Sequence, residues 1–245
     1  HRPGNYPWYQ GMKITDLLRS IHELKDGADL NYILIRREDE LGGKVTVLSA
    51  DLSAALESPA GEFDVELKSG DKVSVITNSY NRQSVIQSLI NEIELQATFD
   101  FPIQKVTING SVRSPGDYPL EIGMKVSDLI RAAGYLSQDA YTVDAELTRF
   151  LQKNNSKDIE IININMQALL SGDKKFDIFL KEGDEIFIKS KPSLNSDLSI
   201  SLEGEVNFPG DYRFKRGETL NDVIRRAGGF TDFAYPKGIL FLRES

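Results

Sequence analysis

The fold is decided by the stretch GSVRSPGDY, residues 110–118, which returns 94 residues later as GEVNFPGDY, residues 204–212. A third copy, cut at its front, is PGNY at residues 3–6, and its proline lies 112 residues before Pro115. Self-similarity of this kind is typical of a chain built from repeated structural units. We therefore predict three related units. The Pro-Gly pairs shape a turn in each, because proline presets its backbone angle and glycine tolerates unusual ones.

An amphipathic helix is predicted after each of these turns. A glycine follows each proline by eight residues, and apolar residues then recur at positions i, i+3, i+4 and i+7. This spacing places them on one face of an α-helix. The three stripes are Ile14, Leu17, Leu18 and Ile21; Val126, Leu129, Ile130 and Ala133; and Leu220, Val223, Ile224 and Ala227. Each unit therefore has a helix with one face to bury.

The ends of these helices carry their own signals. Thr219 with Asp222 three residues later is a capping-box pattern at the start of the last helix. Gly134 and Gly228 stand where a left-handed residue commonly closes a helix, whereas no glycine directly follows Ile21. We expect the first helix to end differently from the other two.

The second halves of the first two copies also match. FDVELKSGDKVSV at residues 63–75 aligns with FDIFLKEGDEIFI at residues 176–188. Each segment predicts a Gly-Asp turn followed by a strand, because its last residues alternate as a half-buried strand requires. A further pair of strands is predicted at residues 32–35 and 45–48, joined across Gly42-Gly43.

Each unit is predicted to run strand, Pro-Gly turn, short strand, helix, two strands, one helical turn and closing strand. The helical turns are expected at residues 52–56 and 166–170. A small mixed sheet covered on one face by a helix is the simplest packing that buries these stripes. The predicted fold class is therefore α+β.

The chain divides into four predicted segments. Residues 1–77 form a first repeat whose front strand is truncated, residues 78–104 a linker, residues 105–190 a second repeat, and residues 191–245 a third repeat truncated at its C-terminus. The third repeat stops before any equivalent of the turn and strand at residues 183–188. We therefore expect it to have an exposed strand edge and the lowest stability.

The two linkers differ in character. Residues 79–98 predict an amphipathic helix, and its apolar residues are Val85, Ile86, Leu89, Ile90 and Ile93. This helix packs either against a neighbouring repeat of the same chain or against another subunit. Residues 189–199 contain Pro192, Asn195 and four serines, a composition that indicates a loop acting as a hinge.

The composition argues against several kinds of site. The 29 basic and 37 acidic residues give a net charge of −8 with no dense basic cluster, so we expect no nucleic-acid partner. Cysteine is absent and His1 and His22 are the only histidines, which argues against thiolate or histidine metal sites and nucleophilic triads. We predict no catalytic residues, no metal and no cofactor.

The repeated motif resembles a known domain family. The pattern G-x-V-x-x-P-G-x-Y, the glycine-led helix and RAGGF at residues 226–230 resemble the soluble-ligand-binding β-grasp (SLBB) domain. Tandem copies resemble the outer-membrane polysaccharide export proteins of capsule and exopolysaccharide systems. The resemblance implies a secreted homo-oligomeric ring that passes polysaccharide from the periplasm to the surface beside an inner-membrane co-polymerase. The export-specific domain and the membrane-crossing C-terminal region of that family are missing from this sequence.

Localisation is expected from the resemblance alone. It implies the periplasm, in association with the outer membrane. No stretch reaches the roughly 18 apolar residues that span a bilayer, and the N-terminus has no signal-peptide pattern. Because residues 1–4 begin in the middle of a repeated motif, we expect this start to be a processing or fragment boundary.

Aromatic and arginine side chains are the candidates for contact with glycan or with another subunit. The aromatic candidates are Trp8, Tyr9, Tyr118, Tyr141, Tyr212 and Tyr235, whose rings are of the kind that stack on sugars. Tyr6, Tyr118 and Tyr212 share one repeat position, which favours packing inside each unit instead. Arg19, Arg131 and Arg225 also recur, on the helix face away from the apolar stripe. They are either ordinary solvated arginines or contacts to a subunit or an anionic polymer.

Three functions fit these patterns. The first is a non-catalytic structural component of a polysaccharide export translocon. The alternative is a stand-alone periplasmic glycan-binding or capsule-assembly accessory protein. The third is an enzyme of envelope carbohydrate metabolism, because paired carboxylates for glycoside cleavage can be drawn from 37 acidic residues.

Overall fold

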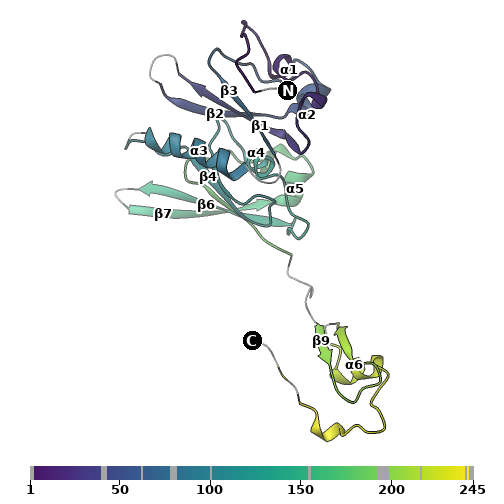
Figure 1. The fold of residues 1–245 in the computed structure, drawn as a ribbon. Helices are drawn as coiled ribbons and strands as arrows, with labels where there is room; N and C mark the ends of the chain where they lie inside the picture. The colour runs from purple at the N-terminus through teal and green to yellow at the C-terminus, as the bar shows by residue number, and fades with distance from the viewer. Residues whose placement is uncertain are drawn as a thin grey trace. The chain divides into compact units, whose positions relative to one another are not determined.

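The computed structural model describes residues 3–39, 43–61, 63–77, 82–99, 101–153, 156–191, 199–215, 217–240 and 242. Two compact units follow one another along the chain, His1–Lys191 and Pro192–Ser245. Both combine short helices with small sheets, so the fold is α+β as predicted (Figure 1). The finer division into three repeats stays a prediction, because residues 1–191 form one unit.

The second repeat contains every predicted element in the predicted order. These are β4 (Lys105–Gly110), β5 (Gly116–Pro119), α4 (Val126–Ala132), β6 (Asp144–Lys153), β7 (Ser156–Asn165), α5 (Met166–Leu170) and β8 (Glu185–Ile188). The five strands form one sheet in the order β5-β4-β8-β6-β7. Strand β4 runs parallel to β8, and the other neighbours in this sheet are antiparallel. The first and last strands of the repeat therefore meet at the centre of its sheet.

Helix α4 confirms the predicted stripe and the predicted glycine closure. Its four stripe residues are buried in the core. Gly134 has φ +74°, and the next N–H, that of Tyr135, donates to the carbonyl of Ile130. A residue with a side chain is strained at this backbone angle, which explains the glycine at the helix end.

The first repeat has a smaller sheet. Its elements are α1 (Ile14–Leu17), the 3-10 helix η1 (Ile21–Glu23), β1 (Ala28–Glu38), β2 (Val45–Ala50), α2 (Leu52–Glu57) and β3 (Lys72–Thr77). The strands lie in the order β2-β1-β3, and both pairings are antiparallel. The pairing of β1 with β2 confirms the predicted strand pair, although Gly42 of its connection lies outside the described residues.

The first helix departs from the prediction. Helix α1 is a single turn that ends at Leu17, and Ile21, the fourth member of its predicted stripe, is 47% exposed in η1. Ser20 begins this 3-10 helix by accepting the N–H of His22 on its hydroxyl. The chain breaks helix here because the serine caps a new turn instead of continuing the old one.

Helix α3 (Arg82–Leu95) lies between the two sheets of the first unit (Figure 1). Its buried residues Ile86, Leu89, Ile90 and Ile93 share one hydrophobic cluster with both repeats. Of the two interpretations of this helix, packing within the same chain is therefore confirmed. Residues 79–81 of the predicted helix lie outside the described residues.

Alternate residues of β1 serve two clusters. Tyr32 and Leu34 belong to the cluster that contains α3 and the second repeat, whereas Ile33 and Ile35 belong to the cluster beneath α1 and α2. This alternation follows from the two-residue period of a strand. The first repeat is consequently covered on both faces of its sheet.

The C-terminal unit has a two-stranded sheet among its described residues. Its elements are β9 (Ser199–Leu202), β10 (Gly210–Arg213), α6 (Leu220–Arg226) and the 3-10 helix η3 (Pro236–Gly238). Thr219 and Asp222 form the predicted capping box, and Gly228 has φ +79°. A small cluster around Val223 and Ile224 is its core. The predicted hinge falls largely on residues 192–198, which lie outside the described residues.

Candidate interaction sites

A buried ion pair recurs in both repeats of the first unit. The Nη2 atom of Arg149 lies 2.6 Å from Oδ2 of Asp184, and Nη2 of Arg37 lies 2.7 Å from Oδ2 of Asp71. Each aspartate also accepts a backbone N–H from the residue three positions earlier. These aspartates are those of the two Gly-Asp turns, so each arginine anchors the turn that leads into the closing strand.

A second aspartate recurs beside the helix starts. Asp64 accepts the N–H and the hydroxyl of Thr15 in α1, and Asp177 accepts the same two groups of Ser127 in α4. An acceptor at a helix start satisfies N–H groups that have no partner within the helix. The conspicuous acids of these two repeats are therefore occupied in shaping the fold.

A groove with a volume of about 840 Å³ runs beside β3 in the first repeat. On one side lie residues 3–6 and Trp8, and on the other lie the outer residues of β3. The indole N–H of Trp8 donates to the carbonyl of Leu67 at 2.9 Å, which fixes the ring at the rim. Apolar side chains of Met12 and Leu18 form part of the lining.

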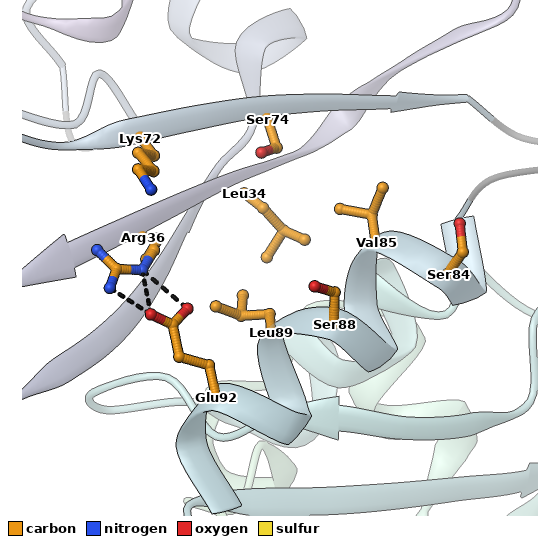
Figure 2. Close-up of a pocket in the computed structure, with 9 residues that line it drawn as sticks. All are labelled: Leu34, Arg36, Lys72, Ser74, Ser84, Val85, Ser88, Leu89 and Glu92. Atoms are coloured by element: carbon orange, nitrogen blue, oxygen red, sulfur yellow. Dashed lines mark hydrogen bonds and ion pairs between the residues drawn. The ribbon is translucent and has the colours of Figure 1, made fainter. Parts of the chain in front are cut away.

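A smaller pocket of about 360 Å³ lies between β1, β3 and α3. Figure 2 shows its lining, with an apolar base of Leu34, Val85 and Leu89. Hydroxyl groups at the same pocket come from Ser74, Ser84 and Ser88, and Lys72 contributes an amino group. A polar rim over an apolar base is typical of small ligand sites.

One end of this pocket is closed by an ion pair. Arg36 donates from Nε and Nη2 to the carboxylate of Glu92, as the dashed lines in Figure 2 show. These bonds hold the pKa of the Glu92 carboxyl below its usual range. The Arg36 side chain is committed to this contact and also pairs with Glu38 at 3.1 Å.

A polar cluster is buried between the two repeats of the first unit. Arg82 at the start of α3 pairs with Asp29 before the middle of β1, and both side chains are about 5% exposed or less. Arg82 also donates to the carbonyl of Ala132 in α4. The guanidinium groups of Arg82 and Arg131 lie 5.4 and 5.9 Å from the ring centre of Tyr32. Cation–π attraction adds to the packing at this distance.

The same cluster contains a carboxyl group with an incomplete set of partners. Glu121 accepts the hydroxyl of Ser49 on Oε2 at 2.7 Å, while its enclosed Oε1 accepts no hydrogen bond from the described residues. Burial raises the pKa of the Glu121 carboxyl to about 7. The sequence analysis missed this cluster, because its members come from β1, β2, α3 and the second repeat, with no common motif.

Arg131 is the predicted site residue whose position corrects the sequence analysis. It donates to the carbonyl of Asn31 at 2.6 Å and to the hydroxyl of Ser49 at 3.0 Å. Its side chain is 15% exposed. Arg131 is therefore neither solvated nor free for a polymer, because it joins α4 to the strands of the first repeat.

Trp8, Tyr9 and Arg19 lie near one another in the first repeat. Tyr9 is 53% exposed, and its hydroxyl is hydrogen-bonded to Asp16, which raises the pKa of the phenol. The exposed Arg19 donates from Nε to the carbonyl of Asp16. Tyr9 and Arg19 thus meet at Asp16, while Trp8 lines the groove beside β3.

The remaining candidates are spread over both units. Tyr141 is half-buried in the first unit, whereas Tyr235 in the second is 74% exposed. Arg225 is exposed and lies 3.7 Å from Asp222 on its own helix. Their roles in contact with glycan or subunits stay predictions.

The three tyrosines at the shared repeat position differ in burial. Tyr118 is fully buried, Tyr212 is half-buried, and Tyr6 is 44% exposed. The hydroxyls of Tyr118 and Tyr212 both donate to the carbonyl four residues earlier, at 2.6 Å. Packing inside the unit is therefore confirmed for Tyr118, holds in part for Tyr212 and fails for Tyr6.

Two segments of the chain match a known domain model. They are residues 105–161 and 200–243, and the model is that of the SLBB domain. These segments are SLBB domains. The first begins with β4 and the second with β9, so both start at the strand before the repeated Pro-Gly turn. No curated protein matches the chain.

The SLBB assignment agrees with the tandem β-grasp-like fold and denotes a binding domain. Residues 3–77 lie outside the matched segments, yet they share the recurring ion pair and the recurring helix-start aspartate with the second repeat. Within the described residues, no cluster of three metal-ligating side chains and no helix able to cross a membrane is found.

Proposed function

We propose that this chain is a non-catalytic structural and interaction component of a bacterial capsule or exopolysaccharide export assembly. The observation that carries the proposal is the pair of SLBB segments in tandem, each beginning at the same strand. The resemblance of such tandem copies to polysaccharide export proteins supplies the kind of assembly. The protein acts in the periplasm next to the outer membrane and takes no part in bond making.

The internal contacts support a scaffold role. The recurring arginines and aspartates bond to one another and to backbone groups, and helix α3 joins two repeats through a shared core. A carboxyl pair that performs glycoside cleavage must instead face a substrate. The charged groups that recur therefore set the relative position of two repeats, as a component of a rigid assembly requires.

The proposed partners are further copies of the protein, an inner-membrane co-polymerase and the exported polysaccharide. Arg19 and Arg225 are exposed and occupy the same repeat position as Arg131. Since Arg131 joins two repeats within the chain, its exposed counterparts are suited to join repeats of different subunits.

Mass measurement of the full-length native protein tests this proposal. A closed ring of defined subunit number is expected, and Arg225→Glu should reduce the ring fraction. Lys175→Glu is the charge-matched control, because Lys175 is also exposed but lies on the second repeat away from these helices. A monomer that stays monomeric at high concentration contradicts the proposal.

The second candidate function is a stand-alone glycan-binding accessory protein. The hydroxyl-lined pocket in Figure 2 favours it, because hydroxyl and amino groups over an apolar base suit a sugar ring. Binding of a neutral oligosaccharide should then be lost in Ser88→Trp, which fills the pocket. Gln87→Trp on the exposed side of the same helix is the matched control. Equal affinity of both variants contradicts a sugar site in this pocket.

A further inference from the structure

The groove beside β3 corresponds to a position that is occupied in the second repeat. The closing strands of the two repeats align, with residues 72–75 of β3 matching residues 185–188 of β8. Strand β8 has β6 on one side and β4 on the other, whereas β3 pairs with β1 alone among the described strands. The free side of β3 is therefore the side that β4 covers in the second repeat.

Both walls of the groove match the two neighbours of β4. Residues 4–7 align with β5, which pairs antiparallel with β4, and β3 aligns with β8, which pairs parallel with it. The groove lies between these two walls and is lined by Tyr6 on one side and by Val73 and Val75 on the other. It is consequently one strand wide.

The side chains along the groove are less buried than their counterparts. Ile186 and Ile188 are 1% and 0% exposed under β4, whereas Val73 and Val75 are only half-buried. Tyr6 is 44% exposed where Tyr118 is fully buried. In the second repeat, Val106 and Ile108 of β4 fill this space and are fully buried themselves.

A glycine is required at the end of the strand that fills such a space. Gly110 has φ +86°, and a Cβ atom on it would lie 2.0 Å from the carbonyl oxygen of Ile188. No side chain fits so close to a backbone atom. Val75 is the residue that aligns with Ile188, so a strand that binds β3 in the same register needs glycine opposite Val75.

We propose that this groove is the seat of one extended strand that runs parallel to β3, and that the polypeptide directly preceding Pro3 supplies it. The strand has apolar residues two positions apart, followed by a glycine two positions later, as in Val106, Ile108 and Gly110. By the 112-residue offset between the repeats, this glycine is the third residue before His1. The sheet of the first repeat then becomes five-stranded.

A second copy of the chain offers no equally suitable strand. Strand β4 is enclosed in its own sheet, and β9 already carries β10 on the side that would face residues 4–7. Docking of β9 would place β10 onto that wall. A single segment continuous with residue 3 meets no such obstacle, because the turn between β4 and β5 joins the same two positions in the second repeat.

Binding of a synthetic strand tests the seat directly. The probe is the chain's own segment QKVTINGSV, residues 104–112, added in trans to the chain of residues 1–245. We expect saturable binding together with slower amide exchange in β3. The matched control peptide carries Gly110→Ala and should bind about tenfold more weakly or worse. Equal binding of both peptides, or no binding of either, overturns the proposed seat.

The source of the strand is tested with a chain lengthened upstream by the residues encoded before His1. This longer chain should show slow exchange in β3 by itself and should no longer bind the peptide. Peptide binding as strong as in the 1–245 chain would assign the seat to another molecule. Concentration-dependent protection of β3 in the 1–245 chain would assign it to a second copy. Either result contradicts the proposed source, and neither bears on ring formation.

Discussion

The second repeat and the C-terminal unit begin with the same motif and differ in everything that follows it. In both, a strand, a Pro-Gly turn, a short strand and a glycine-closed helix are present. The second repeat adds β6, β7 and β8 and forms a five-stranded sheet, whereas the described part of the C-terminal unit keeps two strands. The motif therefore specifies the local chain path, while burial depends on strands that lie far away in the sequence.

The two glycines that open the motif show the same contrast at one atom. Gly110 and Gly204 have nearly equal φ angles, +86° and +87°. A Cβ atom on Gly110 meets the backbone of Ile188, whereas nothing lies within 4 Å of a Cβ atom on Gly204. The position that is crowded in the complete sheet is open in the incomplete one.

The largest expected effect is that of Asp184→Asn in the second repeat. Asp184 is fully buried and pairs with Arg149, so the substitution leaves a buried arginine without its counter-charge. Breaking such a pair costs about 3 to 5 kcal/mol. Hydrogen exchange should show this loss of stability in the first unit, with the C-terminal unit unchanged. Asp71→Asn, at the less buried copy of the pair, should cost less; equal losses would contradict the role of burial.

The matched pair Gly110→Ala and Gly204→Ala separates close approach from backbone strain. A left-handed backbone angle costs an alanine about 1 to 2 kcal/mol at either position. Gly110→Ala adds a steric clash of about 1 to 3 kcal/mol, because Ile188 lies at the centre of a packed sheet. Thermal unfolding of each unit measures both changes. Similar losses at the two glycines would mean that the crowding at Ile188 has no weight.

Glu121 makes the joint between the first two repeats sensitive to pH. Because burial raises the pKa of its carboxyl from 4.5 to about 7, the folded state holds a proton that the unfolded state has released between these values. Stability contributed by this group is therefore lost as the pH rises through that range. Glu121→Gln keeps a neutral side chain and should be more stable than the native chain at pH 8 by about 3 kcal/mol. Parallel stability curves of the two proteins from pH 5 to pH 8 would contradict this.

The smallest expected effect is that of Thr219→Ala in the C-terminal unit. The Thr219 hydroxyl accepts the N–H of Asp222 and caps α6, and loss of such a cap costs about 1 kcal/mol. Because that unit has a small core, exchange should quicken throughout residues 199–230 and stay unchanged in the first unit. Quicker exchange in the second repeat would show that the two units unfold together.

The repeated elements of the fold followed from the sequence, because local spacing and turn residues define them. The second repeat, the cap at Thr219 and the amphipathic helix α3 are examples. The break after α1 was missed, since an apolar residue at Ile21 continues the helical spacing while Ser20 caps a new turn. Periodicity describes which face a residue would occupy and does not say where the backbone leaves the helix.

The candidate site residues were harder to judge from the sequence. Arg131 has the same place in its repeat as the exposed Arg19 and Arg225, yet it is held between two repeats. The packing of α3 and α4 against β1 decides this, and no spacing within one repeat records it. The ion pairs Arg37–Asp71 and Arg149–Asp184 recur as well, but each arginine lies in a strand with no motif around it.

Amide hydrogen exchange on the whole chain tests most directly whether one fold is built repeatedly and completed only in the middle. The amides of β4 and β8 should exchange slowest, those of β3 faster on its free side, and those of β9 and α6 fastest among the paired elements. Protection of residues 199–230 equal to that of residues 105–190 would contradict the account.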